Sequence, residues 1–160
     1  MLIPEAEGRK EDWVAFAERL RQSGYGVLAI DLRTNESAGE ETLVADVAAG
    51  FAFLRDQKRV DAARLGAVGV GVGADGALRF SAAEPSIRVL VLLSPRADAA
   101  LDTVMAYYGS RPVLLAAGQG ELHRQRVEQL ARRARGPAEL KLYEGEAHGL
   151  DLLGARPDLR

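Results

Sequence analysis

The sequence predicts an α/β protein, a three-layer α/β/α sandwich built on a doubly wound, mostly parallel sheet of about six strands. Short apolar runs alternate with amphipathic helical patterns along the chain, in the order β-α repeated about five times. The run at 25–30 is continuously apolar, which is typical of a strand buried on both faces, and 87–93 is expected to be another buried strand. With 160 residues, the chain is expected to form a single domain over residues 1–160.

The elements follow from the spacing of the apolar residues. Trp13, Phe16, Ala17 and Leu20 have the i, i+3, i+4, i+7 spacing of a helix. Strands are expected at 1–3, 25–30, 64–70, 87–93, 112–117 and 140–143. Helices are expected at 11–23, 41–56, 74–82, 98–108 and 122–135, with a short one after His148, and a polar loop is expected at 31–39. The last strand alternates apolar and polar residues, so it is expected at an edge of the sheet.

Composition excludes several classes of function. The net charge of −2 argues against a dedicated nucleic-acid surface. The absence of cysteine excludes a disulfide, a thiolate zinc site and a cysteine nucleophile, and two histidines argue against a histidine-rich metal site. We therefore expect no metal and no cofactor. No apolar run approaches the ~20 residues of a membrane span and no signal sequence is evident, so we expect a cytoplasmic protein.

The glycine-rich stretch 65–78 is predicted to pass from a buried strand through a tight turn into a helix. Two motifs overlap in it. Gly71, Gly73 and Gly76 fit the dinucleotide-binding pattern G-x-G-x-x-G. Gly69, Gly71 and Gly73 fit the frame G-x-nucleophile-x-G, in which position 71 would carry the attacking side chain. Glycine has no side chain that could attack a substrate.

Ligands of doubly wound sheets bind beyond the carboxyl ends of the strands. The polar residues predicted at those ends are Glu5, Asp31, Arg33, Ser94, Gln119, Glu121, His123, Glu144, Glu146 and His148. Ser94 does not occupy the apex of a strand–helix turn, so it is a poor candidate for a nucleophile.

The order of these loops resembles that of the α/β-hydrolases. Residues 24–33 look like the strand and loop that precede the nucleophile turn, and 69–73 stand where that turn stands. Residues 112–121 resemble the strand and turn that carry the acid, and 143–149 resemble the loop that carries the histidine. Within this superfamily the chain is most similar to the dienelactone hydrolase group, because residues 3–8 keep the glutamate and glycine of its first-loop pattern.

The resemblance implies a role for each matching position. Gly71 would occupy the nucleophile position without a reactive group, Glu121 the acid position and His148 the general-base position. The oxyanion hole would be formed by the backbone N–H of Val72 and by one near Glu5 or Ala6. The six strands would lie in the order 25–30, 1–3, 64–70, 87–93, 112–117, 140–143, with the family's amino-terminal strands missing.

Three functions remain open at this point. The first is a weak hydrolase or pseudoenzyme of the ester or lactone hydrolase lineage, which binds a small acyl or anionic ligand. The second is a non-catalytic interaction or structural module on the same fold, which could form a homodimer through an edge strand or an outer helix. The third is a dinucleotide-binding domain using Gly71, Gly73 and Gly76.

Overall fold

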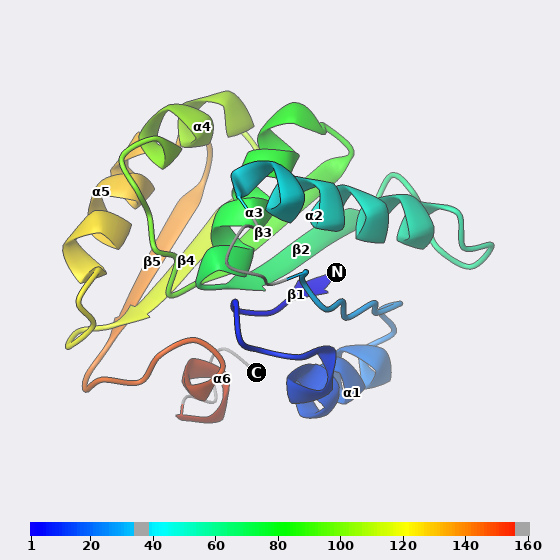
Figure 1. Cartoon of the computed structure of the whole chain (residues 1–160), viewed down its shortest axis with the longest axis horizontal. Coiled ribbons are helices and arrows are strands. Elements are labelled where there is room, and N and C mark those ends of the chain that lie inside the picture. The colour runs from blue at the N-terminus through cyan, green and yellow to red at the C-terminus, as the bar shows by residue number, and fades with distance from the viewer. Residues whose placement is uncertain (34–38, 156–160) are drawn as a thin grey trace.

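The computed structural model describes residues 1–33 and 39–155. Its centre is a five-stranded sheet in the order β1-β2-β3-β4-β5, and every neighbouring pair is parallel (Figure 1). The strands are β1 Leu2–Ile3, β2 Leu65–Val70, β3 Ile87–Leu93, β4 Val113–Gly118 and β5 Ala138–Tyr143. The parallel sheet and its strand order agree with the prediction.

Helices cover both faces of the sheet. They are α1 Val14–Gln22, preceded by a 3-10 turn at Lys10–Trp13, α2 Glu40–Arg55, α3 Val72–Ala83, α4 Leu101–Tyr108, α5 Arg124–Arg133 and α6 Asp151–Ala155. Figure 1 shows α2, α3, α4 and α5 on one face, and α1 and α6 on the other. The predicted three-layer α/β/α arrangement is therefore confirmed. Helix α4 begins at Leu101 rather than at 98, because the Asp98 carboxylate accepts the N–H groups of Ala100 and Leu101 and forms a turn before it.

The prediction of a regular sixth strand at 25–30 is wrong. This segment lies beside β1 as expected, but it forms only an isolated bridge between Leu2 and Ala29. Two hydrogen bonds hold it, from Leu2 N to Leu28 O (2.8 Å) and from Ile30 N to Leu2 O (3.2 Å). A ladder needs a partner of matching length, and β1 ends before Pro4, which has no N–H to donate. The polar loop predicted at 31–39 falls partly on 34–38, outside the described residues.

The sheet separates two apolar clusters, because successive side chains of a strand point to opposite faces. Ile3, Leu92 and Ala117 belong to the cluster beneath α2–α5. Their neighbours Leu2, Leu93 and Ala116 belong to the cluster beneath α1 and α6, which contains the buried Trp13. The carboxyl-terminal halves of β2, β3 and β4 thus pack apolar side chains against helices on both faces of the sheet.

The topology reverses between β1 and β2. The chain leaves β1 toward α1 on one face and leaves β2 toward α3 on the other (Figure 1). Neighbouring strands whose connections diverge in this way leave a crevice at their carboxyl ends, where ligands of open α/β sheets bind. The residues after β1 and β2, which begin at Pro4 and Gly71, therefore face the expected ligand site.

Strand β5 lies at the edge of the sheet, as predicted. Its first three residues are exposed and its last, Tyr143, is buried, and Lys141 Nζ lies 3.6 Å from Glu139 Oε1.

We predict that two glycines of the β2–α3 turn differ sharply in what they tolerate. A Cβ on Gly73 would lie 2.2 Å from the backbone oxygen of Pro4, whereas the atoms nearest to a Cβ on Gly71 belong to the flexible side chain of Glu5, with Oε1 at 2.6 Å. Gly73→Ala should lower the free energy of unfolding by roughly 3 kcal/mol or more. Gly71→Ala should lower the free energy of unfolding by about 1–2 kcal/mol, since the backbone φ of +53° at residue 71 is strained for any residue with a side chain. Urea unfolding of both variants tests this, and equal losses would contradict it.

Candidate functional site

The turn between β2 and α3 has the sharp geometry that a nucleophile would need. Gly71 has φ 53° and ψ −121°, and its N–H donates to Leu93 O at 3.0 Å. Its own carbonyl accepts the N–H groups of Ala74 and Asp75, which starts α3 immediately after the strand. The sequence prediction of strand, tight turn and helix is thus correct, and the apex of the turn carries no side chain.

The predicted acid and base are in contact. Nδ1 of His148, in the loop after β5, lies 3.0 Å from Oε2 of Glu121, in the turn after β4. The Glu121 side chain is only 8% exposed, whereas that of His148 is 45% exposed. Gly118 N donates to the other carboxylate oxygen of Glu121 at 2.7 Å. This carboxylate can therefore orient the imidazole and stabilise its charged form.

Ser94 forms hydrogen bonds to both segments that carry the acid–histidine pair. Its hydroxyl donates to Oε1 of Glu121 at 2.7 Å and accepts the N–H of Gly149 at 2.9 Å, so it joins the loops after β3, β4 and β5. The side chain is buried, and its backbone has an unusual φ of +46°. Sequence reasoning considered Ser94 only as a nucleophile and missed this role. Its place directly after β3, beside the strand that carries the acid, was the available signal.

Glu5 approaches the same histidine from the opposite side. Its Oε1 lies 3.3 Å from Nε2 of His148, and it would lie 2.6 Å from a Cβ built on Gly71. The carboxylate of Glu5 therefore covers the apex of the turn, where a nucleophile side chain would begin. The resemblance placed Glu5 beside this turn, mainly for its backbone N–H, and the structure places its side chain there too.

The predicted oxyanion-hole residues flank this position. Val72 is the first residue of α3, so its N–H is one of those that have no acceptor within the helix. Ala6 follows Glu5 and lines the neighbouring pocket. Their assignment to an oxyanion hole stays a prediction.

An open pocket of about 680 Å³ lies between the loop after β1 and the loop that carries His148. Its charged side chains are mostly acidic: Glu5, Glu7, Asp12 and Asp151, with His148 as the single basic group. Gly71 is buried and does not line the pocket, in agreement with its cover by Glu5.

The two carboxylates decide the protonation of His148. Burial lowers the pKa of His148, but the hydrogen bonds with Glu121 and Glu5 and the two negative charges outweigh it and hold the pKa above its ordinary value of 6.5. With one carboxylate at each ring nitrogen, the imidazolium form can donate to both at once.

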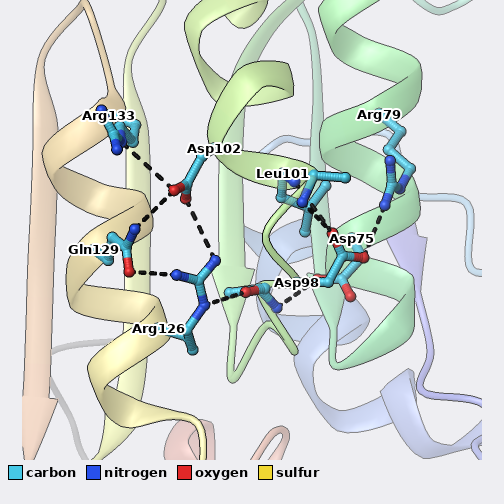
Figure 2. A network of polar contacts seen from close by, with 10 residues as sticks. Asp75, Arg79, Asp98, Leu101, Asp102, Arg126, Gln129 and Arg133 are labelled. Carbon is cyan, nitrogen blue, oxygen red and sulfur yellow. Dashed lines mark hydrogen bonds and ion pairs between the residues drawn. The ribbon is translucent and has the colours of Figure 1, made fainter.

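The loop between β3 and α4, which carries Ser94, is fixed by a polar network. Figure 2 shows Asp102 of α4 facing Arg126, Gln129 and Arg133 of α5. Arg126 Nε also donates to the carbonyl of Ala97 in this loop at 3.1 Å. These contacts join α4, α5 and the loop. They therefore help to fix the loop from which Ser94 binds the acid, Glu121.

The same loop is tied to the nucleophile turn through Asp75. Ala97 N lies 3.4 Å from Oδ1 of this buried carboxylate, and Nη2 of Arg79 donates to Oδ2 of the neighbouring Asp98 at 2.8 Å (Figure 2). Burial raises the pKa of Asp75 to about 7, against the opposing effects of the Ala97 N–H and of the nearby arginines 79 and 96, while the charge of Asp98 adds to the rise.

The other polar residues predicted at the sheet edge do not join the acid–histidine pair. Asp31 pairs with Lys10, and the Nε of Arg33 binds Asp46 at 2.6 Å. The remaining ones are partly or fully exposed in their loops and line none of the pocket beside His148: Gln119, His123, Glu144 and Glu146. Within residues 1–33 and 39–155, no group of three or more His, Asp or Glu side chains has the arrangement of a metal site. No helix in this part of the chain has the length and apolar character needed to cross a membrane.

Comparisons with known proteins give matches at the level of structure alone. No protein-family model matches the chain, and no curated protein sequence matches it either. A dienelactone hydrolase from Anabaena variabilis ATCC 29413 superimposes with a TM-score of 0.81 and 20% identity, over 92% of this chain and 74% of that protein.

Two esterase structures are also similar to this chain. An esterase from Pyrococcus furiosus has a TM-score of 0.73 and 18% identity, over 98% of this chain and 75% of the esterase. An esterase/lipase from an uncultured bacterium has a TM-score of 0.77 and 16% identity, over 99% of this chain and 70% of the other. These likenesses show that the chain has the α/β-hydrolase fold.

We predict that NMR titration will find the pKa of His148 above 6.5, and that Glu121→Gln and Glu5→Gln will each lower it. Because the folded pKa lies above the unfolded one, the proton stabilises the fold fully below pH 6.5, and this contribution is lost as the pH rises through the folded pKa. A His123→Gln background leaves one histidine signal to assign. A wild-type pKa of His148 at or below 6.5, or an unchanged pKa in both variants, would contradict the contacts of His148 with Glu121 and Glu5.

We also predict that Asp75→Asn removes part of the pH dependence of stability. The folded pKa of about 7 exceeds the unfolded value of 3.8, so protonation stabilises the fold below pH 3.8 and this contribution disappears as the pH rises through 7. At pH 8 the variant should be more stable than the wild type, by an amount that shrinks toward pH 4. Denaturant unfolding across this range measures the difference, and the exposed Asp56→Asn is the matched control. A difference that does not vary with pH would contradict the expectation.

Proposed function

We propose that this protein binds a small neutral carboxylic ester or lactone in the pocket beside His148 and hydrolyses it slowly, without a covalent intermediate. The observation that carries the proposal is an acid–histidine pair, Glu121 and His148, assembled beside a nucleophile turn whose apex is Gly71. The α/β-hydrolase fold supports it, since similar structures include a dienelactone hydrolase and esterases.

The chemistry follows from what the turn lacks. In covalent ester hydrolysis a hydroxyl or thiol attacks the carbonyl after the histidine has taken its proton. Gly71 offers neither group, so the attacking oxygen has to come from water. Hydrogen-bond donors for the developing oxyanion and a histidine within reach retain part of the rate enhancement when the nucleophile is missing. Slow turnover is therefore the expected activity.

The charge of the pocket favours a neutral substrate. Four carboxylates face one histidine across the pocket, so an anionic ligand would enter against a negative potential. A neutral ester or lactone avoids this cost. Hydrolysis converts it into a carboxylate, which the same potential repels, so the pocket favours release of the product.

Dinucleotide binding is disfavoured by the cover over the glycine turn. A pyrophosphate on this turn needs close access to the start of α3. The Glu5 carboxylate lies over Gly71, and the carbonyl of Pro4 lies against Gly73. Both put negative charge or partial negative charge where the phosphates would have to bind.

The proposal predicts three activities toward 4-nitrophenyl acetate. Wild type should turn it over slowly and without a burst, and His148→Ala should be slower. Gly71→Ser should gain at least ~10²-fold, show a burst of acyl-enzyme formation and depend on His148, because the hydroxyl would meet the histidine once the Glu5 side chain shifts. Gly71→Ala, with the same Cβ and no hydroxyl, is the control for the gain.

The outcomes of these assays distinguish slow hydrolysis from a non-catalytic role. Turnover that survives His148→Ala would remove the histidine from the reaction. No turnover in any of the proteins, together with no thermal stabilisation by γ-butyrolactone, would reject the proposal and favour an interaction module on the same fold.

A further inference from the structure

We propose that Glu5 is the general base of this reaction, and that it has replaced the missing nucleophile as the working partner of His148. The inference rests on the proposed function and adds to it the group that activates the water. The carbonyl substrate would then be attacked by a water molecule held against Glu5, with no bond to the protein at any stage.

The position of Glu5 carries the inference. Its Oε1 lies 2.6 Å from the position of the Cβ that Gly71 lacks, so it lies against the start of any side chain at residue 71. The same atom lies 3.3 Å from Nε2 of His148, the ring nitrogen that is not bound to Glu121. Gly71 makes room for this carboxylate, so the loss of a side chain at 71 and the placement of Glu5 are parts of one arrangement.

The exposure of Glu5 suits a base. Its side chain is 45% exposed and lines the pocket, so the carboxylate can bind a water molecule that enters with the substrate. Glu121, by contrast, is buried and engaged by Ser94, Gly118 and His148, so it can orient the imidazole but cannot reach the pocket.

Glu5 is better suited to act as a base than as a nucleophile. A carboxylate that adds to an alkyl ester forms a tetrahedral adduct with two leaving groups, of which the carboxylate is far less basic than the alkoxide. The adduct therefore returns to the starting ester. A carboxylate that takes the proton of an attacking water has no such competition, and positioned bases of this kind contribute about 10²- to 10⁴-fold.

The proton that Glu5 takes up and the proton that His148 gives up balance over one reaction cycle. As the water oxygen bonds to the ester carbon, Glu5 takes one water proton, and the carbonyl electron pair moves to the carbonyl oxygen. The predicted donors to this oxygen are the N–H of Val72 and that of Glu5 or Ala6. When the intermediate collapses, the C–O bond breaks and the departing alkoxide takes the Nε2 proton of His148. Glu5 then passes its proton to Nε2 across their contact, and both groups return to their starting forms.

The test compares Glu5→Gln with Glu144→Gln, an exposed glutamate outside the pocket. Glu5→Gln should lower kcat/KM for 4-nitrophenyl acetate by about 10²-fold, while Glu144→Gln leaves it unchanged. Thermal melting of both variants shows that they are folded. An unchanged kcat/KM in folded Glu5→Gln would overturn the inference.

Two further measurements separate this inference from the proposed function. After many turnovers in H₂¹⁸O, the peptide that contains Glu5 should carry no ¹⁸O, and a label there would show covalent attack by Glu5 and overturn the role as base. If γ-butyrolactone stabilises the wild-type protein but neither probe is hydrolysed, the binding site stands and the role of Glu5 fails. If the wild type neither binds nor hydrolyses, both proposals fail.

Discussion

The close contact between the end of β1 and the first turn of α3 decides the shape of this site. Pro4 presents its carbonyl to Gly73 at a separation that leaves no room for a Cβ. Because the two backbones meet here, the next residue, Glu5, is carried over the apex of the turn at Gly71. The wall of the pocket, the cover over the glycine turn and the second carboxylate at His148 all depend on this contact.

The two carboxylates at His148 differ in environment, and the difference separates their roles. Glu121 is buried, receives hydrogen bonds from Ser94 and Gly118 and contacts His148, so the loops after β3 and β5 and the end of β4 fix its position. Glu5 is half-exposed. Its carboxylate contacts His148 but receives no hydrogen bond from Ser94 or Gly118. In the proposed reaction, the acid fixed by hydrogen bonds would hold the ring at one nitrogen, while the half-exposed acid would exchange protons at the other.

The sequence predicted the parts of the site that depend on local pattern. Gly71, Glu121 and His148 each follow a strand in a short recognisable turn, and the parallel sheet brings those turns together. The bracing by Ser94 and the contact of the Glu5 side chain depend on distances between segments far apart in the chain, which periodicity does not encode. The strand expected at 25–30 failed for a similar reason, since its hydrogen bonds depend on the length of β1 rather than on its own apolar residues.

The edge strand β5 has a consequence for association. An exposed strand offers unpaired backbone groups to any other strand that comes near, including one from a second copy of the chain. Glu139 and Lys141 alternate with Leu140 along β5, and their ion pair lies beside that edge. A docking strand would have to strip water from both charges, and this cost would oppose the addition of a further strand at β5.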